Sequence, residues 1–561
     1  MASHRIRARQ PARVPAPPVT RDAGALAGVR RDAAHYPGGH ASGVVHPRSE
    51  AEVAAVVRAS PRLLPIGAQS SLTGGATPVG DVVVATDRMD RIVTLGAGEV
   101  TVEPGVPLAV LQEALRGAGA WYPPAPTFDG ACAGGVAATN AAGAATFKYG
   151  TTRDWVRRLT VVLGTGDVLD LVRGETRAHP DGYFEVLTSR GVQHVPVPSY
   201  RMPHVPKCSA GYFAAPGMDL IDLFVGSEGT LGVITAVTFA IVAPAPRTAL
   251  VWVPVESERS AIALAGALRE AARRTGLDVA AIEHLDARSM AIVREDGVAR
   301  RHNVPVPVGA AVALLVQVEW PAGAEPTAAE AYADIAAALD DVGVEDDDDG
   351  DGDDEHGHED QNRDPARGRP TPGTGDSQLA RLCRLLADAG VLDDAEIALP
   401  SDTRRQADIL AVREAVPEGV NRRVGDAARR LGPAVAKTAA DMVVPFERFA
   451  ESLDLFRGAF DTRGLDYAIW GHISDGNVHP NVIPRKVDDV ARGREAILEC
   501  GRAIVRLGGS PLAEHGVGRH PVKQALLRQL YGDAGVNEMR AVKAALDPEA
   551  RLAPGVLFPE R

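Results

Sequence analysis

The chain has 561 residues, of which 45% are hydrophobic and 24% charged, so it is too long for a single hydrophobic core and too apolar for a disordered protein. The formal net charge is −13, but residues 340–360 contain thirteen acidic and no Lys or Arg side chains, and the rest of the chain is close to neutral. A nucleic-acid-binding protein needs a clustered basic surface, so this class is excluded.

The N-terminal 35 residues are rich in Pro and Arg and show no periodicity, which predicts a disordered tail. No apolar segment of a signal peptide follows the arginines, and no apolar run is long enough to span a bilayer. The four cysteines are widely spaced and indicate reduced thiols. The sequence therefore predicts a cytoplasmic protein without an integral membrane segment, with peripheral membrane contact left open.

Residues 36–246 predict a first domain of the α+β class. Short β-branched runs alternate with Gly-rich turns, and helical periodicity is confined to short segments. The expected strands include residues 81–86, 98–103 and 159–163, and the expected helices are residues 50–59 and 107–117.

Residues 247–558 predict a second domain. Its order of strand, helix, two strands and helix is typical of a ferredoxin-like sheet with helices on one face. These elements are expected at residues 251–255, 260–275, 279–282, 311–319 and 327–340, and further helices at residues 377–386, 403–416 and 445–462. Residues 340–376 are dominated by Asp, Gly, Pro and Arg and predict a disordered acidic insertion, in which His356 and His358 bind cations only weakly.

Three Gly-rich segments stand out in the first domain, at residues 65–75, 133–143 and 226–235. The first has consecutive small residues whose backbone amides can form a nest for a diphosphate, although plain turn chemistry explains it equally well on its own. The second is almost without large side chains, so something other than a protein core must fill the space beside it. The third places small residues before an apolar strand, where a flat ring can lie against backbone. Together they favour a large planar nucleotide cofactor.

The motifs of other nucleotide-binding folds are missing from the sequence. No GxGxxG lies between a strand and a helix, and Gly164 to Asp167 is expected to form a hairpin turn between two β-branched runs. A Walker A motif is also absent. A Rossmann-type NAD site, a kinase and an ATPase are therefore disfavoured.

Two turns near the C-terminus concentrate metal-binding side chains. His472 and His479 flank an Asp-Gly-Asn turn, so a β-hairpin could bring both imidazoles to one point, and Glu514 and His515 occupy a Gly-flanked turn. Two His and one carboxylate leave coordination positions open for substrate, as a catalytic metal site requires. The alternative is that these histidines bind no metal and are hydrogen-bonded in a core or exposed on loops. The distance between the two turns decides between the metal site and this alternative.

The order of the Gly-rich segments resembles the FAD-binding domain of the vanillyl-alcohol oxidase superfamily, from about residue 36 to the C-terminus. Residues 470–481 and 513–518 resemble the GHxGDGNxH and GEHGxG motifs of its D-lactate dehydrogenase, glycolate oxidase and D-2-hydroxyglutarate dehydrogenase branch. The resemblance implies a PCMH-type FAD-binding domain of two α+β subdomains over residues 36–246, followed by the FAD-linked oxidase C-terminal domain over residues 247–558. Members with a covalent flavin often carry His where Gln69 stands, so noncovalent FAD is expected.

The same resemblance implies roles for individual residues. His472, His479 and Glu514 would bind a divalent metal, with zinc as the expected ion, and His515 would be the base beside the flavin. The residues implied to contact FAD are Pro65, Ile66, Gly67, Ala68, Gln69, Ser70, Ser71, Thr73, Pro126, Thr127, Gly134, Gly135, Thr139, Asn140, Gly143, Glu228, Gly229, Gly232, Val233 and Ile234.

Residues that would face the substrate are less well defined. Arg413 matches the arginine that clamps a substrate carboxylate in the family, although spacing alone favours a helical ion pair with a nearby acid. Asn477 is a candidate contact to flavin or substrate. Several positions depart from the family pattern, namely Ser209, Pro417, Lys437, Ser474 and Ala513. The sequence therefore specifies the reaction type but not the substrate.

The predicted reaction is the oxidation of a small D-2-hydroxy acid, of the D-lactate, glycolate or D-2-hydroxyglutarate type, to the 2-oxo acid by hydride transfer to FAD. Quinone, cytochrome, electron-transfer flavoprotein and oxygen all remain as electron acceptors, and a homodimer remains open. Two alternatives are a redox-neutral flavoenzyme resembling alkylglycerone-phosphate synthase and a non-catalytic flavin-binding protein. Reduction of the bound flavin by hydroxy acids would separate the three.

Overall fold

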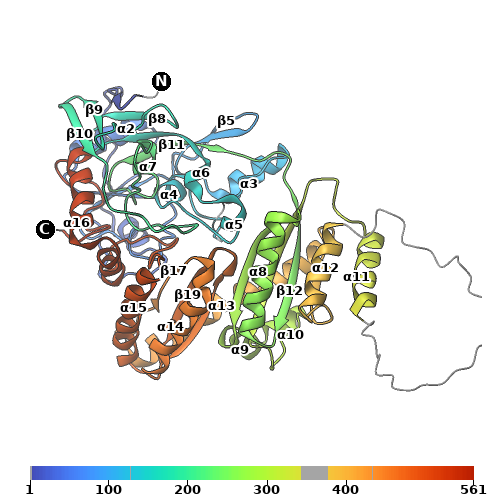
Figure 1. Ribbon diagram of the computed structural model, residues 1–561. Coiled ribbons are helices and arrows are strands. Elements are labelled where there is room, and N and C mark those ends of the chain that lie inside the picture. Colours follow the sequence, from blue (N-terminus) through green and yellow to red (C-terminus); the bar gives the residue numbers. More distant parts are fainter. Residues whose placement is uncertain (1–2, 125, 127, 343–376, 433, 561) are drawn as a thin grey trace, which may run out of the picture. The chain divides into compact units, whose positions relative to one another are not determined.

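The computed structural model describes residues 3–124, 126, 128–342, 377–432 and 434–560. The chain forms two compact units, the first from residues 1–245 and 417–561 and the second from residues 246–416 (Figure 1). The predicted acidic insertion, residues 340–376, lies outside the described residues from residue 343 onward.

A small parallel sheet and one helix form part of the first unit. Strands β2 (Gly43–Val45), β4 (Val82–Ala85) and β3 (Leu63–Ile66) pair in that order, and α2 (Glu50–Ala59) connects β2 to β3, as predicted. The Ser49 side chain caps α2 by accepting the N–H of Glu52. The core around this helix includes Val45, Val53, Val57, Leu63, Val84, Val162 and Val233.

An antiparallel sheet with the strand order β5-β6-β11-β7-β8 follows in the same unit. Its strands are β5 (Ile92–Leu95), β6 (Glu99–Val102), β11 (Val233–Ala240), β7 (Val156–Val162) and β8 (Val168–Val172). The turn between β7 and β8 contains Gly164 to Asp167, so the predicted hairpin is confirmed. The helices of this region are α3 (Leu108–Gly117), α4 (Ala133–Ala138), α5 (Thr146–Tyr149), α6 (Thr152–Trp155) and α7 (Ile221–Phe224).

The N-terminal segment is ordered from Ser3, so the expected disordered tail is wrong for residues 3–35. Strand β1 (Arg5–Arg7) pairs in parallel with β9 (Tyr183–Thr188), which pairs antiparallel with β10 (Gly191–Pro196). The Asp22 side chain caps α1 (Ala23–Gly28) by accepting two backbone N–H groups. The prediction failed because the partners of β1 lie far along the sequence and leave no local pattern.

Residues 417–561 belong to the same compact unit as the N-terminal half, whereas the sequence predicted one domain over residues 247–558. The backbone N–H of Leu63 in β3 donates to the carbonyl oxygen of Arg551, and the N–H of Ala553 donates to the carbonyl oxygen of Leu63. Arg519 and Asp81, both buried, form an ion pair at 2.7 Å. These contacts join the end of the chain to the parallel sheet of β2, β4 and β3. The predicted second domain is therefore divided after residue 416.

The C-terminal part of the first unit combines a β-hairpin with three helices. Strands β18 (Asp466–His472) and β19 (Asn477–Ile483) pair with each other, and β19 also pairs with β16 (Thr438–Ala439) and β17 (Met442–Val443). The short 3-10 turn η2 (Ile473–Asp475) joins the two hairpin strands, and η1 (Phe446–Arg448) precedes α14. The helices are α14 (Phe449–Asp461), α15 (Asp488–Arg506) and α16 (Pro521–Leu546), of which α16 lies beside β10 (Figure 1).

Within the second unit, the strands pair in the order β15-β12-β14-β13, all antiparallel. The last strand of the unit thus lies beside the first, which is the ferredoxin-like arrangement that the sequence predicts. The strands are β12 (Arg247–Val255), β13 (Val279–Asp286), β14 (Val312–Trp320) and β15 (Glu396–Ala398). The helices are α8 (Glu258–Arg274), α9 (Ala287–Glu295), α10 (Val298–His302), α11 (Ala328–Val342) and α12 (Gln378–Asp388).

Helix α13 (Thr403–Leu431) continues through Pro417, so its predicted end at residue 416 is wrong. A proline inside a helix costs about 3 kcal/mol. Buried valines recur at every fourth position on both sides of Pro417, namely Val412, Val416, Val420 and Val424. The packing of this apolar stripe outweighs the cost of the proline. None of the helices in the described ranges has the length and hydropathy of a membrane-spanning segment.

Candidate active site

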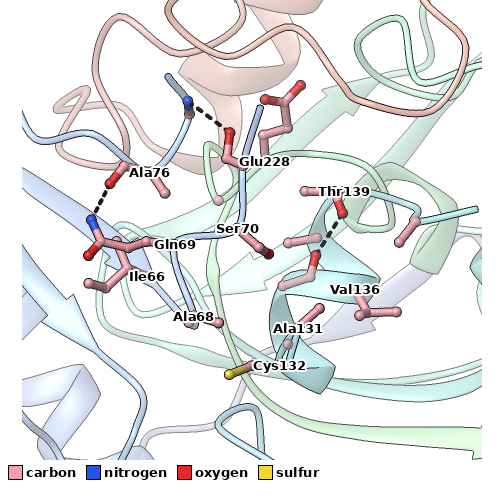
Figure 2. Close-up of a pocket in the computed structure, with 18 of the residues that line it drawn as sticks. Ile66, Ala68, Gln69, Ser70, Ala76, Ala131, Cys132, Val136, Thr139 and Glu228 are labelled. Carbon is pink, nitrogen blue, oxygen red and sulfur yellow. Dashed lines mark hydrogen bonds between the residues drawn. The ribbon is translucent and has the colours of Figure 1, made fainter. Parts of the chain in front are cut away.

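A cavity of about 320 Å³ lies in the first unit, and all three Gly-rich segments line it (Figure 2). Most of the residues predicted to contact the cofactor form its wall. They are Pro65, Ile66, Gly67, Ala68, Gln69, Ser70, Ser71, Pro126, Gly134, Gly135, Thr139, Glu228, Gly229, Gly232, Val233 and Ile234.

Three of the predicted cofactor residues do not line the cavity. The carbonyl oxygen of Thr73 accepts the N–H of Arg519 instead. The Asn140 side chain accepts the N–H of Arg153, and the carbonyl oxygen of Gly143 accepts the hydroxyl of Thr146. These groups of all three residues are therefore bonded within the protein. Thr127 lies outside the described residues.

Other wall residues were not predicted individually. Most are small or apolar, and such residues are more often core than site. They are Leu72, Gly75, Ala76, Thr86, Pro104, Phe128, Ala131, Cys132, Val136, Ala138, Ala141 and Ala142. Several lie inside or next to the first and second Gly-rich segments, and these segments are the regional signal that the sequence offers.

The second segment presents backbone to the cavity. A Cβ added at Gly135 would meet no other atom within 4 Å and would project into open space. A Cβ at Gly134 would lie 2.5 Å from the Pro104 side chain, so this position admits only glycine. A wall without side chains suits a flat ring lying against it. The cavity therefore fits the flavin that the sequence predicts.

The first segment is held in shape by the Gln69 side chain. Its Nε2 donates to the carbonyl oxygens of Val29 at 2.9 Å and Ala76 at 2.7 Å, and the second of these bonds is drawn in Figure 2. The backbone of Gln69 is left-handed, with φ of 52°. Both N–H groups of the amide are thus used within the protein.

Glu228 links the third segment to the turn that carries Glu514 and His515. Its Oε1 accepts the N–H of Val517 and its Oε2 accepts the N–H of Gly518, both at 2.8 Å. Burial raises the pKa of Glu228 to about 7, although these two hydrogen bonds favour its charged form. The cofactor cavity and this turn therefore share a buried carboxylate.

The hairpin β18–β19 brings the two predicted histidine ligands together. His472 is paired with Asn477, two residues before His479, so the two histidines are diagonal neighbours across the strands. Their ring centroids lie 5.4 Å apart. Glu514 Oε1 lies 3.2 Å from His479 Nε2 and 3.7 Å from His472 Nε2. The distance between the hairpin histidines and the turn with Glu514, which the sequence left open, is therefore small.

His515 joins this cluster and also reaches the cavity. Its Nε2 lies 3.5 Å from Glu514 Oε1, and both Glu514 and His515 line the cavity wall. Burial lowers the pKa of His515 to about 4, against the attraction of the nearby Asp441 and Glu514 carboxylates. The imidazole is therefore neutral near pH 7 and able to accept a proton.

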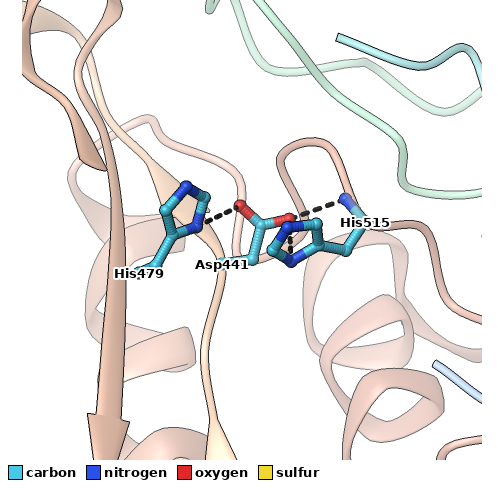
Figure 3. Close-up of side chains that lie close together, drawn as sticks. All are labelled: Asp441, His479 and His515. Atoms are coloured by element: carbon cyan, nitrogen blue, oxygen red, sulfur yellow. Dashed lines mark hydrogen bonds and ion pairs between the residues drawn. The ribbon is translucent and has the colours of Figure 1, made fainter. Parts of the chain in front are cut away.

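Asp441, to which the sequence assigned no role, lies between His479 and His515 (Figure 3). Its Oδ2 accepts the backbone N–H groups of Glu514 and His515, both at 2.8 Å, and lies 3.4 Å from His515 Nδ1. Its Oδ1 lies 3.4 Å from His479 Nδ1. Burial would raise the pKa of Asp441, but the two histidines hold it well below the usual range. The carboxylate thus orients both imidazoles from behind.

Asn477 supports Asp441 and does not line the cavity, where a contact to flavin or substrate was predicted. Its side chain is fully buried, and Nδ2 donates to Asp441 Oδ1 at 3.0 Å and to the carbonyl oxygen of Met442 at 2.9 Å.

Lys207, like Asp441, is a residue of the site that the sequence did not identify. Burial would lower its pKa, but Asp475 and Glu514 raise it above the ordinary value, so it stays charged.

Two groups of side chains could hold a metal ion within the described residues, and they share His479. The ligand atoms of His472, His479 and Glu514 lie within 4.8 Å of one another, and so do those of Asp441, His479 and His515. The first group offers the nitrogen and oxygen donors that zinc accepts, and three imidazole nitrogens surround one oxygen of Glu514. The Asp441 carboxylate already accepts hydrogen bonds from Asn477 and two backbone amides. The first group, which is the predicted one, therefore fits a divalent ion better.

Arg413 lies in the second unit, where it forms a buried ion pair with Glu283. Its Nε and Nη2 each lie 2.9 Å from Glu283 Oε2. Spacing alone favoured an exposed helical ion pair with a nearby acid, but Glu283 lies in β13, 130 positions away in the sequence, and the pair is buried. A role in binding the substrate carboxylate stays a prediction.

Comparison with known proteins places the chain among flavoproteins. The model for an FAD binding domain matches residues 41–171, and the model for the C-terminal domain of FAD linked oxidases matches residues 246–355 and 369–557. A D-2-hydroxyglutarate dehydrogenase of Xanthomonas citri pv. viticola is 26% identical over 527 residues, which are 91% of this chain and 88% of that protein. A D-lactate dehydrogenase of Anaerostipes hadrus is 26% identical, with the same coverage of 91% and 88%.

Solved structures show the same fold. The 4-ethylphenol oxidase from Gulosibacter chungangensis aligns with a TM-score of 0.61 and 16% identity, covering 97% of this chain and 95% of that one. An alkyldihydroxyacetonephosphate synthase aligns with a TM-score of 0.56 and 14% identity, covering 96% and 82%. At such identities the likeness concerns the fold alone. The predicted PCMH-type FAD-binding fold is confirmed, and the chain belongs to the FAD-linked oxidases, as an FAD-dependent oxidoreductase.

Proposed function

We propose that the protein oxidises a small D-2-hydroxy acid to the corresponding 2-oxo acid, with noncovalently bound FAD and a divalent metal ion. One observation carries the proposal: Glu514 and His515 line the same cavity as the three Gly-rich segments. The names of the relatives, D-2-hydroxyglutarate dehydrogenase and D-lactate dehydrogenase, support a 2-hydroxy acid as the substrate class.

The residues of the site divide the reaction among them. The substrate loses two hydrogens, one as the hydroxyl proton and one as a hydride from the adjacent carbon. When bound, the flavin supplies the hydride acceptor and the divalent ion supplies a Lewis acid that lowers the pKa of the hydroxyl. His515, neutral and on the cavity wall, accepts the hydroxyl proton. Asp441 orients His515 and then stabilises the imidazolium through its Nδ1.

Three further roles belong to the proposal. His472, His479 and Glu514 hold the divalent ion, with zinc as the expected metal. Arg413 binds the substrate carboxylate, for which its forked donors are suited. Gln69 leaves the flavin noncovalent because an amide whose two N–H groups are already bonded offers no nucleophile.

The test is anaerobic mixing of the purified yellow protein with a panel of D- and L-2-hydroxy acids. We expect a D-acid to remove the visible flavin absorption in the wild type. The His515→Ala variant should keep its FAD and lose this reduction. His520→Ala is a matched control, because His520 lies five residues further on and does not line the cavity. Its flavin should be reduced normally.

The outcomes also decide between the reaction classes. Reduction of the flavin in His515→Ala at the wild-type rate would reject its role as the base. A wild type that no hydroxy acid reduces would favour a redox-neutral or a non-catalytic flavoprotein. Acid precipitation should release the flavin into the supernatant, and flavin that stays with the protein would contradict noncovalent binding.

A further inference from the structure

Lys207 is a buried cation that contacts both segments carrying the proposed metal ligands. Its side chain is 1% exposed, and its Nζ lies 2.9 Å from Glu514 Oε2 and 3.0 Å from Asp475 Oδ2. Asp475 is the last residue of η2, in the connection between His472 and His479. One ammonium group thus joins the hairpin β18–β19 to the turn at residues 513–518.

The contact with Lys207 gives the two oxygens of Glu514 different partners. Oε2 accepts a hydrogen bond from the ammonium group. Oε1 faces the Nε2 atoms of His479, His515 and His472, at 3.2, 3.5 and 3.7 Å. A charge-assisted hydrogen bond of this kind restricts rotation of the carboxylate. Glu514 is therefore left with one oxygen to offer to a cation beside the imidazoles.

We propose that Lys207 is a positioning residue of the metal site. It orients Glu514 as a one-oxygen ligand and holds the two ligand-bearing segments together. Groups behind a metal ligand commonly set its orientation, and their loss weakens metal binding. This inference rests on the divalent ion of the proposed function. The alternative is an ion pair that supports the fold alone, since loss of one partner of a buried pair is destabilising anywhere in a protein.

Metal affinity and ligand geometry separate these two roles, because a structural pair changes only stability. The experiment removes metal from the FAD-loaded protein with a chelator and titrates it with Co²⁺, whose visible absorption reports the ligand geometry. In Lys207→Gln we expect the Co²⁺ affinity to fall about tenfold to hundredfold. The Co²⁺ spectrum should also change, because Glu514 is then free to rotate.

Lys543→Gln is the matched control. Lys543 is also buried and lies 2.8 Å from a carboxylate, that of Asp547. Its other acceptors are the carbonyl oxygens of Thr230 and Leu552, and none of these residues is a proposed metal ligand. The control should lose thermal stability and keep the wild-type Co²⁺ affinity and spectrum. An equal loss of Co²⁺ binding in Lys543→Gln would overturn the proposal, as would unchanged binding and spectrum in Lys207→Gln.

A second variant keeps the test decisive if Lys207→Gln does not fold. Asp475→Asn has the same shape and leaves Lys207 and all three ligands in place, but it removes the second carboxylate that anchors the ammonium. We expect a several-fold loss of Co²⁺ affinity, and wild-type affinity would overturn the proposal. A wild type that binds no Co²⁺ refutes the proposed metal and this inference with it. A wild type that binds Co²⁺ but is not reduced by hydroxy acids refutes the proposed reaction alone.

Discussion

The Oε1 atom of Glu228 lies 2.8 Å from the backbone nitrogen of Val517, and this hydrogen bond joins a cofactor-lining turn to the turn that carries Glu514 and His515. A second bond, from Gly518 to Oε2, completes the contact. Cβ atoms at Gly516 or Gly518 would collide with Glu228 or Thr73, and both glycines have left-handed φ angles. The position of His515 thus depends on a carboxylate that belongs to the cofactor cavity.

The first prediction concerns the pH dependence of stability. Burial raises the pKa of Glu228 from 4.5 to about 7. Between these values the folded protein holds a proton that the unfolded chain has released, so this contribution to stability is full below about pH 4.5 and is lost as the pH rises through 7. The loss corresponds to about 3 kcal/mol. In Glu228→Gln, the free energy of unfolding should therefore fall less than in the wild type between about pH 5 and pH 8.

Denaturant unfolding at a series of pH values measures this difference. Glu113→Gln serves as the control, because Glu113 is an exposed carboxylate that pairs with Arg116 on the surface. Its pH profile should match that of the wild type. If Glu228→Gln also follows the wild-type profile, the carboxylate does not titrate in this range.

The second prediction uses the open space at Gly135. Gly135 lines the cavity and an added Cβ there meets no other atom within 4 Å, so we expect a Leu side chain to extend into the cavity. Leucine also favours a helix more than glycine does. We expect the flavin-free protein to be as stable as the wild type. FAD affinity should fall about tenfold to hundredfold, since overpacking costs about 1–3 kcal/mol. Gly117→Leu at the end of α3, where an added Cβ also meets no atom within 4 Å, should bind FAD normally in a fluorescence titration.

The parts of the site that the sequence predicts are those with local signals. Consecutive small residues at 65–71 line the cavity because a strand end and a tight turn place their backbone there. The Asp-Gly-Asn turn predicts the hairpin that brings His472 toward His479, since hairpin pairing is a local property. Ferredoxin-like pairing in the second unit likewise follows from the order of apolar runs and helices.

Contacts between distant segments leave no such pattern. Asp441 reaches Glu514 and His515 from the link between β16 and β17, more than seventy residues earlier, and the sequence assigned it no role in the site. Lys207 and Glu514 are 307 positions apart in the sequence. Asn477 has the right residue type for a ligand contact, but its position in the hairpin buries it behind the imidazoles against Asp441. Tertiary packing decides each of these cases.

The third prediction separates two roles of Arg413. Its ion pair with Glu283 is buried, so removal of the charge would destabilise the unit whether or not substrate binds there. Arg413→Lys retains a positive charge for Glu283 but loses the forked donors that bind a carboxylate at two points. We expect KM for the hydroxy acid to rise about tenfold to hundredfold, the value of a lost charge-assisted hydrogen bond, with a small change in kcat. An unchanged KM would reject a role for Arg413 in substrate binding.

The fourth prediction concerns the N-terminal strand. Removal of residues 1–10 deletes β1 and its pairing with β9, together with the backbone bond from Arg9 to Val168 at 2.8 Å. It also deletes the ion pairs of Arg9 with Glu50 and Asp170, but these are exposed and contribute little. The truncated protein should therefore melt several degrees lower, while Arg9→Ala alone should melt close to the wild type. Removal of β1 leaves β9 as an unpaired edge strand. An unchanged melting temperature of the truncated protein would show that the pairing with β1 does not stabilise the fold.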